Sequence, residues 1–172
     1  MNTLVVYHSQ FGNTEQVAQA IAGVFQGAGA ARTLSTERFT AADLQDVDLV
    51  VMGTPTHKMN LPQAVRPIFE ELPRRSLRGV PIAAFDTSYR MSAFLARFTA
   101  AKRTDRKLRK LGGKQLVPPE TFHVKDHHEG PLYDGEIERA KTWAESILEN
   151  LNGGSAEDSC RLLPARYHEP ES

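Results

Sequence analysis

Three short runs of consecutive apolar residues constrain the fold of this chain more than any other feature. They are Leu4-Val5-Val6-Tyr7, residues 47–52 (whose single interruption is Asp48) and residues 80–85. Runs with so little polar interruption are typical of strands buried on both faces of a parallel sheet. Between the first two runs, residues 13–27 repeat apolar side chains at helical spacing. The sequence therefore predicts an α/β protein with helices on both faces of a parallel sheet.

The other elements give weaker signals. We expect a strand near 31–36, a short helix or turn at 43–46, a helix from Pro62 to about Leu72, a helix from about 92 to 111 closed by Gly112-Gly113, and an extended segment from about Gln115 through Val124. A last helix is expected from about Gly135 to Leu151, with Asp134 as its N-cap. Residues 1–151 then form one domain, and residues 152–172, which lack periodicity, form a flexible tail.

Composition excludes several classes of protein. The chain has 172 residues, which suits one domain, and its 21 basic and 21 acidic residues balance, so bulk charge points to neither nucleic acid nor membrane. Its single cysteine, Cys160, forms no internal disulfide and lies in the expected tail, where nothing marks it as a nucleophile. The first residues are too short and uncharged for a signal peptide, and no apolar run approaches the roughly 20 residues that span a bilayer. We expect a cytoplasmic protein.

The loop after the first apolar run carries the clearest functional signal. It consists of Ser9, Gln10, Phe11, Gly12, Asn13 and Thr14, and it opens the first helix. Backbone N–H groups at a helix N-terminus attract anions, and the two hydroxyls can donate hydrogen bonds while glycine allows close approach. These are the groups that bind a phosphate monoester without lysine or arginine.

Two nucleotide-binding motifs do not fit this loop. It lacks the Gly-Lys-Ser/Thr of a Walker loop and the further glycines of the dinucleotide fingerprint. A nucleoside triphosphate with magnesium is therefore disfavoured. The alternative is a plain turn in which Asn13 only caps the helix.

The segment Tyr7-His8-Ser9-Gln10-Phe11-Gly12-Asn13-Thr14 resembles the phosphate loop of the flavodoxin family, Ser/Thr-x-Thr-Gly-x-Thr, and departs from it at Phe11. The resemblance covers about residues 3–150 as a pattern. It implies a doubly wound, five-stranded parallel sheet of order 2-1-3-4-5 that binds flavin mononucleotide (FMN) as a redox protein. The phosphate would lie on Ser9 to Thr14.

The same resemblance implies two loops that hold the flavin ring. The first contains Thr54, Pro55, Thr56, His57, Lys58, Met59, Asn60 and Leu61, and the second contains Asp86, Thr87, Ser88, Tyr89, Arg90 and Met91. We expect Tyr89 to stack on the ring. Flavodoxins that carry electrons are usually acidic and have a glycine in the first of these loops, whereas this chain has no glycine there and places His57, Lys58 and Arg90 in the two loops.

These departures leave two rival functions open. Gly53-Thr54-Pro55-Thr56 also resembles the loop of flavodoxin-fold quinone reductases, which implies an NAD(P)H:quinone reductase. The other rival is a flavodoxin-fold binding or regulatory module without flavin. The implied partners are FMN, NAD(P)H or a redox protein, with no membrane and no nucleic acid.

Two clusters of charged residues have no place in the expected flavin site. Residues 102–114 hold seven basic residues and one acid, which we interpret as a solvated helix face with cations near its C-terminus. The alternatives are a nucleic-acid patch, which lacks interleaved aromatic residues, and a docking face for an acidic partner or for the phosphates of a pyridine nucleotide. His123, Asp126, His127, His128 and Glu129 suggest a metal, but Gly130-Pro131 favours a solvated loop, and no metal is expected. If that loop lies beside the flavin, one histidine can donate a proton.

Overall fold

The structure is a computed structural model that describes residues 1–56, 60–90, 92, 98–125 and 129–160, with side chains described as far as residue 153. The strands are β1 (Asn2–Tyr7), β2 (Ala30–Ser35), β3 (Leu49–Pro55), β4 (Pro81–Tyr89), β5 (Lys114–Gln115) and β6 (Glu120–Val124). The α-helices are α1 (Asn13–Gln26), α2 (Arg66–Glu71), α3 (Ala100–Lys110) and α4 (Glu136–Cys160). Two 3-10 helices, η1 (Ala41–Leu44) and η2 (Gln63–Val65), complete the described elements.

The strands form one parallel sheet of order β2-β1-β3-β4-β5, with β6 also paired to β4. β5 pairs with Pro81 and Ile82 at the start of β4, whereas β6 pairs with Phe85 to Tyr89 at its end. β5 and β6 therefore occupy one strand position in succession. Pro118-Pro119 separates them, because proline has no N–H to donate to a ladder. This arrangement confirms the predicted doubly wound fold and the order 2-1-3-4-5.

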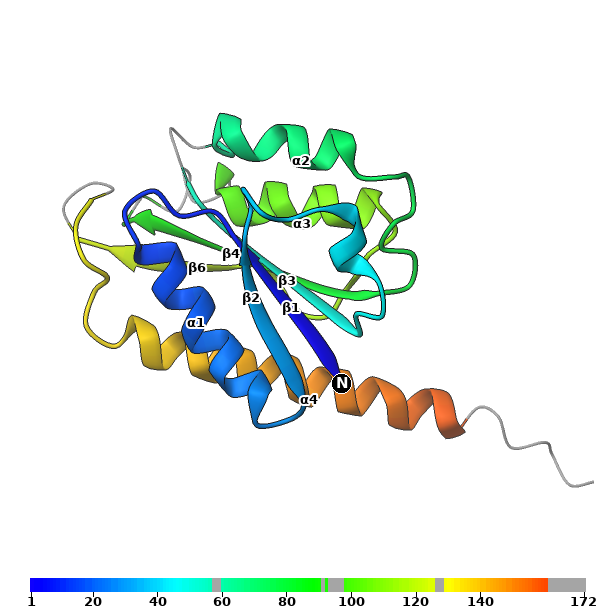
Figure 1. Ribbon diagram of the computed structural model, residues 1–172. Coiled ribbons are helices and arrows are strands. Elements are labelled where there is room, and N and C mark those ends of the chain that lie inside the picture. Colours follow the sequence, from blue (N-terminus) through cyan, green and yellow to red (C-terminus); the bar gives the residue numbers. More distant parts are fainter. Residues whose placement is uncertain (57–59, 91, 93–97, 126–128, 161–172) are drawn as a thin grey trace, which may run out of the picture.

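Helices cover both faces of the sheet, with α1 and α4 on one face and α2 and α3 on the other (Figure 1). Each helix layer closes its own apolar core. The first is centred on Phe25, Phe85, Phe122 and Trp143, and the second on Leu4, Met52, Phe69 and Ile82. Gly53 is required by this packing, because a Cβ there would lie 2.0 Å from Cζ of Phe85.

Two strands continue further than the sequence predicts. β3 ends at Pro55 rather than at Met52, and β4 ends at Tyr89 rather than at Phe85. Polar residues made these segments look like loops. They remain strand because β4 is paired on both sides, with Thr54 and Pro55 of β3 and with β6. Most of the expected second ring loop, residues 86–91, is therefore the end of a central strand.

The expected ends of the helices also need correction. Asp134 does not cap α4: its carboxylate lies 3.1 Å from Nζ of Lys125, and Gly135, at a φ of 86°, precedes the helix. α4 continues to Cys160, beyond the expected end at Leu151, and the domain boundary at residue 151 stays a prediction. α3 begins at Ala100 rather than near 92, and it closes at Gly112-Gly113 as predicted, where the Gly113 N–H donates to the carbonyl of Leu108.

Candidate functional site

The site is positioned by a reversal in the direction of winding. The chain passes from β1 to α1 on one face of the sheet and from β3 to α2 on the other (Figure 1). Connections that leave neighbouring strands toward opposite faces open a crevice at the carboxyl ends of those strands. β1 and β3 are hydrogen-bonded neighbours, so the loops that follow them border this crevice.

The first of these loops, residues 8–12, ends in a glycine that turns the chain into α1. Gly12 has a φ of 85°, in the left-handed region that favours glycine. Its N–H donates to Oγ of Ser9 at 3.0 Å, and its carbonyl accepts the first helical bond from Gln16 at 3.0 Å. The N–H groups of Asn13, Thr14 and Glu15 therefore have no acceptor within the helix. They are the donors that the sequence predicts for an anion.

The side chains of Asn13 and Thr14 anchor the loop to distant strands. The Asn13 amide donates to the carbonyl of Gly130 at 2.8 Å, and no side-chain capping bond is made at this helix. The alternative reading of Asn13 as a simple helix cap is therefore wrong. Oγ1 of Thr14 lies 2.8 Å from Oγ1 of Thr87 in β4, within a buried contact. This contact fixes the first turn of α1 against the centre of the sheet.

A cavity joins the loop to the ends of three strands. Its volume is about 20 Å³, about the space of one water molecule. The residues around it come from the first loop and from β3, β4 and β6, and comprise Ser9, Gln10, Phe11, Asn13, Thr14, Pro55, Thr56, Thr87 and Val124. The structure thus brings together members of all three segments that the sequence assigned to the site.

Thr54 and Asp86, which the sequence assigns to the ring loops, have no exposed surface. Thr56 is also buried, and its hydroxyl donates to Oδ2 of Asp86 at 2.5 Å. The N–H groups that open α3 then bind this pair: Ala100 donates to Thr56 Oγ1 at 2.8 Å and Ala101 to Asp86 Oδ2 at 3.0 Å. The Thr56 and Asp86 side chains thus attach the N-terminus of α3 to the sheet, and a place for Thr54 and Asp86 beside a flavin ring stays a prediction.

The electrostatics of Asp86 follow from this position. Complete burial raises the pKa of its carboxyl group above the ordinary value, since a carboxylate is poorly solvated there. Hydrogen bonds from Thr56, Thr121 and the α3 backbone oppose part of this rise in pKa.

The remaining residues of the expected second ring loop have separate surroundings. Ser88 is fully buried, and its hydroxyl donates to the carbonyl of Tyr89 at 3.2 Å. Tyr89 packs beside the core that α1 and α4 cover. The guanidinium carbon of Arg90 lies 4.3 Å from the centre of the Tyr133 ring, so Arg90 contacts an aromatic residue of the chain itself. Stacking of Tyr89 on a flavin stays a prediction, and Met91 lies outside the described residues.

The loop after β3 is described only in part, since His57, Lys58 and Met59 lie outside the described residues. Asn60 follows them, and its Oδ1 accepts the N–H of Leu61 at 2.9 Å. A second, open pocket of about 590 Å³ lies here, bordered by His8, Gln10, Asn60, Leu61, Pro62, Gln63, Ala64 and Arg66. Its size falls in the range of small-molecule sites.

His8 and Arg66 belong to this second pocket, and neither was predicted from the sequence as a site residue. Nδ1 of His8 lies 3.0 Å from Thr36 Oγ1 and 3.1 Å from Glu37 Oε1. Their signal was weak, because His8 precedes the first loop by one residue and Arg66 follows the predicted ring loop of 54–61 by five residues, in the first turn of α2.

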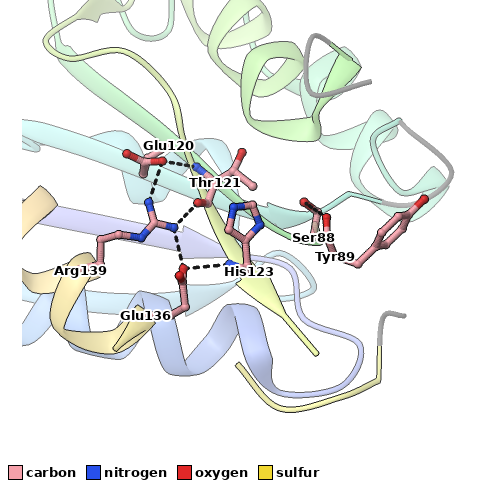
Figure 2. A network of polar contacts seen from close by, with 7 residues as sticks. All are labelled: Ser88, Tyr89, Glu120, Thr121, His123, Glu136 and Arg139. Atoms are coloured by element: carbon pink, nitrogen blue, oxygen red, sulfur yellow. Dashed lines mark hydrogen bonds and ion pairs between the residues drawn. The ribbon is translucent and has the colours of Figure 1, made fainter. Parts of the chain in front are cut away.

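A network around Arg139 holds β6 at the edge of the site (Figure 2). From the first turns of α4, the Arg139 guanidinium lies 3.0 Å from Glu120 and 2.6 Å from Glu136, and it donates to the carbonyl of Thr121. Oε2 of Glu136 in turn accepts the N–H of His123 at 2.9 Å. Although burial opposes the charge, the two carboxylates raise the pKa of Arg139.

The network fixes the backbone of His123, which pairs with Ser88 in register. Within the described part of the chain, Nδ1 of His123 is buried without a hydrogen-bond partner. Those residues also contain no group of three histidine, cysteine or acidic residues placed to hold a metal ion, and Asp126, His127 and His128 lie outside them. Nor do they include a helix with the length and apolar character needed to cross a bilayer.

A doubly wound sheet of order 2-1-3-4-5, with a glycine-containing loop at its winding reversal, defines the flavodoxin-like class of α/β proteins. The family model described as Flavodoxin matches residues 5–143. The chain belongs to the flavodoxin family, which confirms the resemblance carried by the first loop. No curated protein sequence matches the chain.

Solved structures show the same fold. A flavodoxin from the domain Archaea has a TM-score of 0.71 at 21% identity and covers 88% of this chain and 99% of its own. Flavodoxin 2 from Bacillus cereus has a TM-score of 0.72 at 19% identity, covering 87% of this chain and 99% of its own. Rubredoxin oxygen:oxidoreductase from Desulfovibrio gigas has a TM-score of 0.69 at 21% identity, with 90% of this chain matching 37% of that one.

Proposed function

We propose that this chain binds FMN in the crevice beyond β1 and β3 and acts as a redox protein that exchanges electrons with a small molecule or a protein partner. The observation that carries the proposal is the first loop, where unpaired helix N–H groups and the hydroxyls of Ser9 and Thr14 border one cavity with β3 and β4. Membership of the flavodoxin family supports FMN as the ligand.

The loop fits a phosphate monoester in its chemistry. The Ser9 oxygen already accepts from Gly12, so its O–H remains a donor toward the mouth of the cavity. The small volume of the cavity favours a phosphate at its mouth rather than inside it. Among the described residues, no lysine or arginine borders this cavity, and the N-terminus of α1 supplies favourable charge there.

When bound, FMN would supply the reversible uptake of electrons. The chain's own residues would bind and orient it. Ser9 to Thr14 would hold the phosphate, and Pro55, Thr56 and Thr87 would form the wall of the crevice, because they already border the cavity. His57, Met59, Asn60, Tyr89 and Arg90 remain the residues proposed to lie near the ring.

The experiment is a titration of the purified chain with FMN, followed by quenching of flavin fluorescence. Ser9→Ala removes one hydroxyl donor to a charged phosphate, so we expect its Kd for FMN to rise about tenfold. Ser146→Ala is the matched control, since its hydroxyl bonds the carbonyl of Trp143 in α4, and its Kd should equal that of the wild type. A wild-type chain that leaves flavin fluorescence unchanged at high FMN concentration would overturn the proposal.

The larger pocket favours one second candidate, an NAD(P)H:quinone reductase. It adjoins the first loop and combines Arg66 and His8 with amide side chains, which suits an anionic, ring-containing molecule. Steady-state oxidation of NAD(P)H with a quinone tests this candidate. Turnover by the FMN-loaded chain would support a reductase. Absence of turnover would disfavour the reductase and leave electron exchange with another partner as the proposed function.

A further inference from the structure

Charge is strongly separated along this chain although the total is balanced. Residues 66–114 contain 13 lysines and arginines but only 4 acids, whereas the rest of the chain contains 8 basic and 17 acidic residues. Residues 66–114 run from α2 to β5 and include both helices of one face of the sheet (Figure 1). The excess of positive charge lies in α3, which has six cations and one acid, and in residues 74–78, which have three cations and no acid, whereas α2 has one cation and two acids.

Two of the four acids of this segment, Glu70 and Glu71 in α2, are exposed, and the other two are buried. Asp86 is completely buried, and Asp105 is nearly so, with Arg109 Nε 2.8 Å from its carboxylate. The exposed surface of α3 presents Lys102, Arg106, Arg109 and Lys110, and Arg74, Arg75 and Arg78 lie beyond its C-terminal end, where the Leu77 and Gly79 N–H groups donate to Leu111 and Gly112. We call this surface the basic face.

Helix stability does not explain the basic face. The helix dipole favours cations in the last turn, which accounts for Lys107, Arg109 and Lys110. It disfavours them in the first turn, where α3 carries Lys102 and Arg103 and no acid. Like charges four residues apart, such as Lys102 and Arg106, also destabilise a helix. These cations destabilise the helix, and a surface that carries them nevertheless is a candidate for binding a partner.

The basic face reaches the candidate site and carries an exposed aromatic side chain, Phe98, at that end. The first N–H groups of α3 bind Thr56 and Asp86, at the carboxyl edge of the sheet. Phe98 precedes α3 and is 42% exposed, and Phe11 in the first loop is 46% exposed; these are the exposed large hydrophobic residues of the described chain. Aromatic anchors beside charged residues are typical of protein interfaces.

We propose that the basic face, together with Phe98, docks a redox protein whose own docking surface is acidic. The proposal rests on the proposed function, because only a bound flavin gives such a partner an electron to exchange. A nucleic acid fits less well: α3 has no aromatic residues between its cations on which successive bases stack, and the face adjoins a redox site that a nucleic acid does not use.

The test uses cytochrome c in two forms that share one haem: the native protein, whose surface is basic, and a lysine-succinylated form, whose surface is acidic. The FMN-loaded chain is reduced with dithionite, the excess is removed, and haem reduction is followed by anaerobic stopped flow. One two-electron-reduced FMN reduces two ferric haems to ferrous, returns to oxidised FMN and releases its protons to water.

We expect the succinylated form to react faster, with a rate constant that falls as ionic strength rises. Arg106→Glu should lower this rate constant about fivefold at low salt and raise the rate with native cytochrome c. Lys141→Glu, a matched charge reversal on α4 at the opposite face, should change neither rate by more than about twofold. Faster reaction with the native form, or equal effects of the two variants, would overturn the proposal.

Calorimetric titration of the chain with succinylated cytochrome c measures binding without flavin. It therefore tests the docking proposal separately from the proposed function. If the chain binds succinylated cytochrome c through Arg106 but binds no FMN, the docking proposal is supported and the proposed electron-exchange function is overturned. The same titration is made with a 20-base-pair DNA duplex. If the duplex binds more tightly than succinylated cytochrome c, and Arg106→Glu abolishes that binding, the basic face is assigned to nucleic acid and the proposal is overturned.

Discussion

Asp86 carries a carboxyl group that the fold removes from water entirely. Its side chain accepts hydrogen bonds from the Thr56 hydroxyl and the N–H of Ala101, so it joins β3, β4 and the start of α3. Because α3 begins the basic face and Thr56 precedes the expected ring loop, this residue connects the candidate site to the proposed docking surface.

The pH dependence of stability tests the buried state of Asp86. Burial raises its pKa in the folded chain above the ordinary value of 3.8. Its contribution to stability is therefore full below about pH 4 and is lost as pH rises through the folded-state pKa. Asp86→Asn removes this titration while keeping an acceptor for Ala101. We expect the unfolding free energy of the wild type, relative to Asp86→Asn, to fall with rising pH by up to about 1.4 kcal/mol per unit.

Urea unfolding at several pH values above 4 measures this difference. A difference that grows with pH would show that the carboxylate form is the stabilised one, and that the hydrogen bonds outweigh desolvation.

At the residue scale, short-range chemistry was predictable and long-range partners were not. Ser9, Gly12 and Thr14 predict an anion-binding loop from the sequence, because the expected donors all come from one turn of chain. The partner of Asn13, Gly130, lies 117 residues away, so nothing local distinguishes this amide from a helix cap. Asp86 looked like a loop residue for the same reason, since its partners come from β3 and α3.

At the scale of elements, Arg139 is the residue that couples α4 to β6. Arg139→Leu would leave Glu136, which is 9% exposed at its side chain, without its cation. Arg139 itself is 39% exposed, so solvent screens part of the effect, and we expect a loss of about 1–3 kcal/mol in unfolding free energy. Lys141→Leu breaks the exposed pair with Glu138 and should cost less than about 0.5 kcal/mol. Urea denaturation compares them, and equal losses would contradict the structural role of the Arg139 network.

Strands buried on both faces were predictable as elements because their residues are almost all apolar. Their ends were not, because Thr54 and Asp86 are polar yet fully buried, and the hydrogen bonds of Asp86 come from Thr56 and from α3. The Arg139 network was equally invisible, since its members come from a strand and a helix and each looks like an ordinary surface charge in the sequence.

At the scale of the whole molecule, the winding of the sheet determines where the proposed site lies. Strand order, the crevice beyond β1 and β3 and the family all follow from a few apolar runs and one loop. The surface charge needed the structure, because the cations of segments 74–78 and 102–110 form one face only after the C-terminal end of α3 meets Leu77 and Gly79. The interpretation of residues 102–114 as a solvated helix face covers the cations of α3. It leaves out the cations of residues 74–78, which the fold places at the C-terminal end of α3.

The comparison of FMN with riboflavin tests the central claim most directly, because the two ligands differ only in the phosphate. If the loop of Ser9 to Thr14 binds that phosphate, the chain should bind FMN at least about 100-fold more tightly than riboflavin, in line with several hydrogen bonds to a charged group. The Kd values are measured by fluorescence quenching at one ionic strength, with Ser9→Ala as a second protein. In this variant the FMN affinity should fall and the riboflavin affinity should stay unchanged. Equal affinities of the wild type for the two ligands would contradict the account.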